Sequence, residues 1–244
     1  MATVLYVFAH PDDETLAASA SIVKHLQAGH DVHILWCTRG EASVVLSHLN
    51  GLALSSWWGL LHNPVAEGYL PLDSIAFASA RIAEATAAAR CLGSGIATIG
   101  LHEAGLPDGG VAQLDVEESI LTIADFIAPG APVRLKGHTW MPQLDNHPDH
   151  RAIGAAIKQL ATEDPVRFGD RRFYIEPAYW SDPDLGLVER GWETVTGDDA
   201  DRVVNACRCF AAWAPDRGSY AIGEHSVSSW FSTLKAAPKS MYHK

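Results

Sequence analysis

Thr3-Val-Leu-Tyr-Val-Phe-Ala9 is a short run of mostly apolar, β-favouring residues, and His10-Pro-Asp-Asp-Glu14 follows it directly. Such a run is typical of a parallel strand that is buried on both faces. From residue 14 to residue 28 the apolar side chains recur at helical spacing, and Gly29 fits the helix stop. The segment therefore predicts a strand, a polar loop and a helix in succession.

The same alternation of strand and helix continues through most of the chain. It predicts an α/β fold, with a Rossmann-like, doubly wound, mostly parallel sheet and helices on both faces. We expect one domain over residues 1–244, with a motif core at 3–160 and an irregular C-terminal tail from about 215. Further strands are predicted at 31–38, 96–101, 133–139, 172–180 and 193–196, and further helices at 73–92, 115–128, 148–161 and 198–213.

Composition excludes several classes of protein. The 18 basic and 29 acidic residues give a net charge of −11, which argues against binding of nucleic acid through a basic face. A hydrophobic content of 48% argues against disorder. Residues 42–66 carry no Asp, Glu, Lys or Arg, but their His and Asn side chains argue against a membrane span. Because no secretory leader is recognisable, we expect a cytoplasmic protein.

A second polar segment, Asp145-Asn-His-Pro-Asp-His150, follows the predicted strand at 133–139. In an open α/β sheet, ligands bind beyond the carboxyl ends of the strands, where the strand order reverses. If the predicted strands lie in the order third, second, first, fourth and fifth, the first and fourth flank that crevice. The two polar segments would then face each other across it.

Residues in these two segments match a metal site. Two imidazoles and one carboxylate around an open position are typical of hydrolytic zinc sites. His10, Asp13 and His150 would be the ligands, Asp12 would act as a base toward an activated water molecule, and His147 would lie on the same rim without ligating. A His-Pro-Asp segment alone is equally well explained as a turn or a helix cap. Two such segments at two strand ends favour the metal site.

The pair of segments resembles a known family, the LmbE-like or PIG-L-like zinc deacetylases. Its marks are His-Pro-Asp-Asp-Glu after the first strand and His-x-Asp-His after the fourth, and both are complete here. The resemblance covers about residues 3–160 and implies hydrolysis of N-acyl groups, mostly from amino sugars of the N-acetylglucosamine type. Weaker similarities lie at Thr38–Glu41, Arg81–Glu84, Leu92–Gly93 and Leu106–Gly109.

The resemblance also implies roles for single residues. It makes His147 the group that stabilises the tetrahedral intermediate and Asp149 the partner that orients His147. It implies Zn²⁺ as the cofactor, although Fe²⁺ can occupy the same kind of site, and an N-acylated small molecule as the partner. The metal ligands that it implies are His10, Asp13 and His150, with Asp12 as the general base.

Three features depart from the family pattern. Asp145 stands where the deacetylases of thiol precursors carry a Tyr, the segment from Glu41 to Arg81 is longer than expected, and Ser43 replaces a common Gly. The first departure argues against that subgroup.

Substrate contacts are expected from Arg39, Glu41 and Asp108, which could bind sugar hydroxyls. Alternatively, Arg39 and Glu41 form a surface ion pair and Asp108 belongs to a plain turn. Arg81 and Glu84 are predicted to form a pair on a helix surface.

The aromatic insert at about 43–70, uncharged except for Glu67, leaves three alternatives open, because its Trp57 and Trp58 could belong to a lid, a subunit interface or the core. A homo-oligomer is therefore one expectation. For the function, an amidase that cleaves a small thiol conjugate is the main alternative. A non-haem Fe(II) oxygenase and a non-catalytic binding protein are weaker ones.

Overall fold

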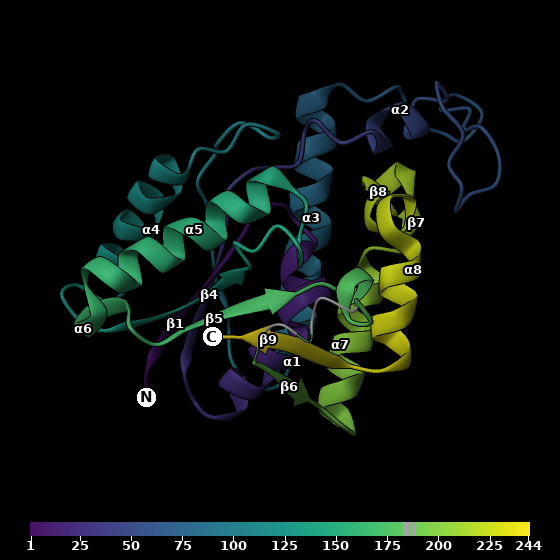
Figure 1. Cartoon of the computed structure of the whole chain (residues 1–244). Helices are drawn as coiled ribbons and strands as arrows, with labels where there is room; N and C mark the ends of the chain where they lie inside the picture. Colours follow the sequence, from purple (N-terminus) through teal and green to yellow (C-terminus); the bar gives the residue numbers. More distant parts are fainter. Residues whose placement is uncertain (183–185, 187–188) are drawn as a thin grey trace.

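The computed structural model describes residues 1–182, 186 and 189–244. Its centre is a seven-stranded sheet in the order β3-β2-β1-β4-β5-β9-β6 (Figure 1). The first five strands pair in parallel, whereas β9 runs antiparallel to both β5 and β6. The predicted fold class is confirmed, and the first five strands lie in the order on which the expected crevice depends.

The elements have the following bounds. The strands are β1 (Thr3–Phe8), β2 (Asp31–Trp36), β3 (Gly100–Glu103), β4 (Val133–His138), β5 (Arg171–Ile175), β6 (Arg190–Thr194), β7 (Trp213–Ala214), β8 (Ser219–Tyr220) and β9 (Lys239–His243). The helices are α1 (Asp13–Gln27), α2 (Val45–Leu49), α3 (Ser74–Gly93), α4 (Gln113–Ile127), α5 (Pro148–Glu163), α6 (Pro165–Phe168), α7 (Asp198–Cys209) and α8 (Ile222–Ala236). Two short 3-10 helices are η1 (Pro177–Tyr179) and η3 (Pro215–Arg217).

Helices cover both faces of the sheet, because successive side chains of a strand point to opposite sides. Tyr6 and Phe8 of β1 pack in one core cluster with residues of α1, α3, α7 and α8. Leu5 and Val7 pack in the other cluster with residues of α4 and α5, which lie together on their own side in Figure 1. The central strand is therefore buried on both faces, and its two ends are the places where polar loops can gather.

The third strand differs from its predicted position at 96–101. Residues 94–99 form the turn that follows α3, with Gly95 in the left-handed region at a φ of 71°, and β3 starts at Gly100. A Cβ atom at Gly100 would lie 2.1 Å from Nδ1 of His33 on the neighbouring strand. Glycine at this position thus allows β3 to approach β2.

The prediction of an irregular tail from about 215 is wrong. Residues 222–236 form α8, whose Phe231 and Leu234 are buried in the core cluster beside α1 and α3. Residues 239–243 form β9, which fills the space between β5 and β6 and buries Met241 completely. The C-terminal segment therefore completes both the sheet and one of its covering layers.

The insert at 43–70 is divided between the core and the surface. Val45 and Leu49 of α2 are buried in a small cluster with residues of α3 and β8. Trp58 lies 4.8 Å from Trp213, measured between ring centroids. Further along the insert, Leu60 and Leu61 are exposed. That they belong to a lid or to a subunit interface stays a prediction. In the part of the chain that the structure describes, none of the helices has the length and apolarity needed to cross a membrane.

Candidate metal centre

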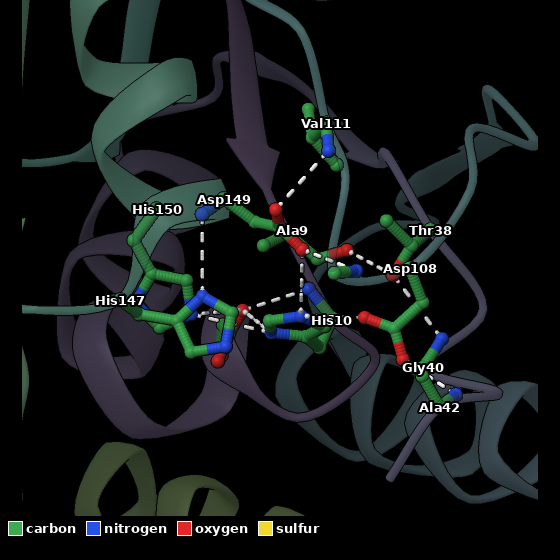
Figure 2. Close-up of polar contacts among 12 residues, drawn as sticks. Ala9, His10, Thr38, Gly40, Ala42, Asp108, Val111, His147, Asp149 and His150 are labelled. Atoms are coloured by element: carbon green, nitrogen blue, oxygen red, sulfur yellow. Dashed lines mark hydrogen bonds and ion pairs between the residues drawn. The ribbon is translucent and has the colours of Figure 1, made fainter.

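The candidate site lies where β1 and β4 end side by side. His10, Asp12 and Asp13 follow β1 at the start of α1, and His147, Asp149 and His150 lie at the start of α5. The structure thus brings the two polar segments together. Figure 2 shows the rings of His10, His147 and His150 next to one another, with centroids 4.5 to 5.2 Å apart.

Three ligand atoms converge at the centre of this group. Nδ1 of His10 lies 3.3 Å from Oδ2 of Asp13 and 3.2 Å from Nε2 of His150, and the last two atoms are 3.5 Å apart. Ligands at 2.0–2.2 Å from a tetrahedral zinc ion are separated from one another by about 3.3 Å. The three donor atoms therefore have the spacing that one divalent ion requires.

Carboxylates behind the two histidines determine which ring nitrogen is free. Nδ1 of His150 lies 2.8 Å from Oδ2 of Asp145, and Nε2 of His10 lies 3.1 Å from Oδ1 of Asp108. A carboxylate accepts a hydrogen bond, so each of these nitrogens carries the proton. The other nitrogen of each ring then presents its lone pair to the convergence point, as in the carboxylate–histidine pairs around protein-bound zinc.

Asp13 is held at the centre by its neighbours. Its Oδ2 accepts a hydrogen bond from the backbone N–H of His10 at 2.7 Å and lies 3.1 Å from Nε2 of His138. The His138 ring stacks on His150 at 3.7 Å between centroids. Burial lowers the pKa of His138 to about 4, so this ring is neutral at pH 7.

Two other nearby imidazoles could in principle replace a ligand, because His147 and His138 lie within reach of the same atoms. Nδ1 of His147 accepts the backbone N–H of Asp149 at 3.3 Å and thereby caps α5. In the neutral ring its Nε2 then carries the proton and acts as a donor. Nε2 of His138 lies 3.3 Å from the backbone N–H of Ala9. Nδ1 of His147 is thus engaged in the helix cap, and Nε2 of His138 lies against both Ala9 and Asp13.

The charges around the site favour a cation. Burial lowers the pKa of His10, but the carboxylates of Asp13, Asp108 and Asp149 outweigh it and raise that pKa well above its usual range. Burial raises the pKa of Asp13, but the imidazoles around it outweigh burial and hold the pKa well below its usual range. The surrounding carboxylates therefore favour positive charge at the point where the three donor atoms meet, which suits a divalent ion.

Asp12 lies beside the three donor atoms, buried in the same cavity. Its Oδ2 is 3.1 Å from Nη2 of Arg81, and Arg81 also donates to the backbone carbonyl of Gly40 at 2.9 Å. Burial raises the pKa of Asp12 more than the charge of Arg81 lowers it. A carboxylate with a raised pKa accepts a proton more readily, which is the property that a base needs.

The predicted surface pair on α3 is wrong. Arg81 and Glu84 are both buried, at 6% and 5% exposure. Arg81 reaches Asp12, whereas Glu84 accepts hydrogen bonds from the backbone N–H groups of Tyr220 and Ile222. The helix α3 thus directs Arg81 toward the site and Glu84 toward the start of α8, where other elements supply their partners.

Asp149 differs from the role that the resemblance implied. Its carboxylate accepts the backbone N–H groups of Gly109 at 2.8 Å and Val111 at 3.1 Å, and it lies 3.7 Å from Nε2 of His10 (Figure 2). The backbone N–H of Asp149 donates a hydrogen bond to Nδ1 of His147. Asp149 therefore fixes the loop after β3 and the back of His10, while its main chain orients His147.

The three predicted substrate-binding residues are separated by the structure. Among the described residues, Asp108 lines the cavity, whereas Arg39 and Glu41 lie outside its lining. Arg39 pairs with Glu103 at 2.7 Å, and Oε1 of Glu41 accepts the backbone N–H of Asp108 at 3.2 Å. The expected pair between Arg39 and Glu41 is replaced by these contacts.

The cavity at the site has a volume of about 290 Å³. Several of its residues escaped the sequence analysis, because nothing near them in the sequence marks a site. Glu176 follows β5, is 2% exposed, and leaves its Oε1 without a hydrogen-bond partner among the described residues. The remaining wall comes from the C-terminal segment, through Ser226, Val227 and Trp230.

Known proteins share the sequence pattern. The model of the PIG-L family, described as GlcNAc-PI de-N-acetylase, matches residues 5–161. A 1D-myo-inositol 2-acetamido-2-deoxy-alpha-D-glucopyranoside deacetylase of Rhodococcus opacus is 26% identical over 205 residues, which cover 77% of this chain and 64% of the relative. A deacetylase of the same name from Mycolicibacterium gilvum is 28% identical and is covered to 68%, with 80% of this chain. The chain thus spans about two thirds of these relatives.

Solved structures share the fold. A deacetylase of the antimicrobial A40926 pseudoaglycone aligns with a TM-score of 0.63 at 19% identity, over 99% of this chain and 96% of the other. The N,N'-diacetylchitobiose deacetylase of Pyrococcus horikoshii aligns with a TM-score of 0.53 at 16% identity, over 95% of this chain and 76% of the other. A 4-carboxy-2-hydroxymuconate hydratase aligns at 0.55 and 16%, over 97% and 89%, so the fold alone does not determine the reaction. The matched residues 5–161 contain both polar segments, and the chain belongs to the PIG-L family.

Proposed function

We propose that the protein is a metal-dependent hydrolase that removes an N-acetyl group from a small molecule containing an amino sugar. The observation that carries this proposal is the convergence of three lone pairs from His10, Asp13 and His150, at mutual distances of 3.2 to 3.5 Å. The names of the relatives in Rhodococcus and Mycolicibacterium, which are deacetylases of an acetamido sugar, support the same reaction class.

The three ligands would hold one divalent ion, which we propose to be Zn²⁺, with Fe²⁺ as the alternative. When bound, such an ion lowers the pKa of a water molecule to about 7 and polarises a carbonyl oxygen. Asp108 and Asp145 would keep His10 and His150 in the ligating tautomer, because each accepts a hydrogen bond from the far ring nitrogen, which carries the proton.

Asp12 is the proposed general base. It lies in the cavity one residue before the ligand Asp13, and Arg81 holds its carboxylate in place through one oxygen. In this role Asp12 removes a proton from the attacking water molecule. The contact with Arg81 fixes the orientation of the carboxylate.

His147 is the proposed donor to the developing oxyanion. Because its Nδ1 accepts the backbone N–H of Asp149, its Nε2–H is left to donate toward the cavity. Burial lowers the pKa of His147, so a neutral ring would perform this task. The hydrogen bond would strengthen as negative charge develops on the carbonyl oxygen. Asp108, which lines the cavity, stays the proposed sugar contact.

The main alternative is an amidase that acts on a small thiol conjugate, and residue 145 is a position where the chain departs from the thiol-precursor subgroup of the family. In that subgroup the resemblance places a Tyr at this position, whereas here Asp145 supports His150. The cytoplasmic location and the absence of nucleic-acid partners stay predictions from the sequence, as does the homo-oligomer.

Acetate release from methyl N-acetylglucosaminide and a panel of N-acetyl amino sugars tests the proposal. We expect release of acetate that is abolished by a chelator and restored by Zn²⁺ or Fe²⁺. Release of a larger acid from a thiol conjugate, with none from any acetylated sugar, would favour the amidase. Turnover that depends on dioxygen would favour the oxygenase.

A further inference from the structure

The cavity has two sides of different chemistry. One side carries the proposed ligands and Asp12. What we call the apolar side consists of the large apolar residues of the lining, Leu16 from α1, which is almost fully buried, and the partly exposed Val227 and Trp230 from α8. The chemistry proposed above uses the polar side and leaves the apolar side without a task.

A break in α8 accompanies this apolar side. Val227 departs from helical geometry, with φ of −140° and ψ of 49°, so two helical pieces meet at this residue. The start of α8 is anchored, because Glu84 accepts the backbone N–H of Ile222 at 3.1 Å. Trp230 is partly buried against the core cluster and still lines the cavity. The ring is therefore both supported from behind and open to a ligand.

The apolar side comes largely from outside the family pattern. That pattern matches residues 5–161, which contain all three proposed ligands, Asp12 and Leu16. Val227 and Trp230 lie more than sixty residues beyond its end. The residues for the chemistry and two of the three residues of the apolar side thus come from different parts of the chain, as expected for a wall that selects among substrates.

We propose that Leu16, Val227 and Trp230 form a subsite for an alkyl or aryl group of the substrate, with Trp230 as a specificity-determining residue. This inference rests on the proposed deacetylation. A partly exposed aromatic ring in a cavity gains contact area and loses hydration when an apolar group packs on it. Two sources could supply that group, a longer N-acyl chain or an apolar aglycone, and the substrates below separate them.

Kinetics on matched substrates test the subsite. Methyl and hexyl N-acetylglucosaminides differ in the aglycone, and methyl glucosaminides with N-acetyl and N-hexanoyl groups differ in the acyl chain. We expect the unaltered protein to prefer one of the longer substrates by about ten-fold or more in kcat/KM. Trp230→Ala removes that preference, whereas Trp230→Phe keeps most of it. Val227→Ala should weaken the preference in the same direction.

Trp192→Ala is the matched control, because Trp192 is a half-exposed tryptophan on β6 that does not line this cavity. It should keep the preference for the longer substrate. Thermal unfolding of each variant verifies that the fold is intact, and Trp230→Phe and Val227→Ala carry the test if Trp230→Ala does not fold. Equal kcat/KM for short and long substrates in the unaltered protein, or an unchanged ratio in Trp230→Ala, would overturn the proposal.

Calorimetric binding of the amine products separates this inference from the proposed function. Hexyl glucosaminide should bind about ten-fold tighter than methyl glucosaminide if the aglycone occupies the subsite, and Trp230→Ala should abolish the difference. This measurement needs no turnover. A protein that binds both compounds alike, shows equal kcat/KM for the N-acetyl and N-hexanoyl substrates, and releases acetate would retain the proposed function and lose the subsite. A protein that shows the binding difference but releases no acetate would retain the subsite and lose the proposed function.

Discussion

Asp12 directly precedes the ligand Asp13 in the sequence, yet its side chain contacts Arg81 and lines the cavity. If Asp12 is the base, Asp12→Ala lowers kcat for acetate release by about 10²- to 10⁴-fold. The variant should keep the metal content of the unaltered protein, because His10, Asp13 and His150 remain. Metal analysis beside the kinetics checks both statements. Near-full activity at full metal content would contradict the assignment.

Asp145 supports a ligand from behind, through its 2.8 Å contact with Nδ1 of His150. Replacing Asp145 by Ala frees the ring to rotate or to change tautomer. We expect zinc affinity to fall by about 10- to 100-fold, as for other partners that lie behind metal ligands. Competition with a chromophoric chelator measures the affinity. Asp115→Ala, on the exposed face of α4, is the control and should leave it unchanged.

At the scale of single residues, the sequence predicts the residues of the two polar segments, but it does not predict the side chains that hold them in place. The spacing within His10–Asp13 and His147–His150 is local, so a motif can reveal it. Asp145 was noted as a departure from a family pattern, but its contact with His150 was not foreseen. Arg81 reaches Asp12 across 69 positions of sequence, and a pairing of that kind leaves no mark in either neighbourhood.

Among the elements, α3 and α8 are joined by one buried carboxylate. Glu84 accepts the backbone N–H groups of Tyr220 and Ile222, and removing it leaves those donors buried and unpaired. We expect Glu84→Ala to lower the free energy of unfolding by about 1–3 kcal/mol. Glu84→Gln keeps an acceptor oxygen and should lose less. Urea unfolding measures both variants, and equal midpoints for Ala and the unaltered chain would refute this role.

The strand β9 gives a second test among the elements. Met241 is fully buried between β5 and β6, and Met241→Ala should lower the free energy of unfolding by about 2–5 kcal/mol. Val166→Ala, at a side chain that is 84% exposed, is the control and should change it little. Comparable losses in both variants would contradict the position of β9 inside the sheet.

The same strand explains what the sequence could not predict at this scale. The alternation of strands and helices from residue 3 to residue 163 repeats a parallel unit, and it is sufficient to predict a parallel sheet covered by helices. β9 is a five-residue strand that pairs antiparallel with β5 and β6, which precede it by dozens of residues. β9 joins β6 to the edge of β5, and no local pattern records either pairing.

Across the whole molecule, two buried histidines outside the candidate metal centre, His25 and His225, should make stability depend on pH. Burial lowers the pKa of His25 to about 4 and that of His225 to about 3. In the unfolded chain both titrate near 6.5. As the pH falls below about 6.5, these histidines bind protons in the unfolded state but not in the folded state. The free energy of unfolding therefore decreases toward acid pH.

Urea unfolding at pH 7.5 and pH 5 measures this loss while most carboxylates remain charged. His225→Asn removes one of the two groups and should show a smaller drop in unfolding midpoint between the two pH values than the unaltered chain. An equal drop in both proteins would show that His225 does not contribute.

The account as a whole depends on one ion that is held jointly by His10, Asp13 and His150. Metal content per chain, measured by mass spectrometry after dialysis against zinc and gel filtration, tests this most directly. We expect about one zinc ion per chain in the unaltered protein and a loss of most of it in His10→Ala, Asp13→Ala and His150→Ala alike, with acetate release falling in parallel. One ion retained per chain in all three variants, or full activity of the metal-free protein, would contradict the account.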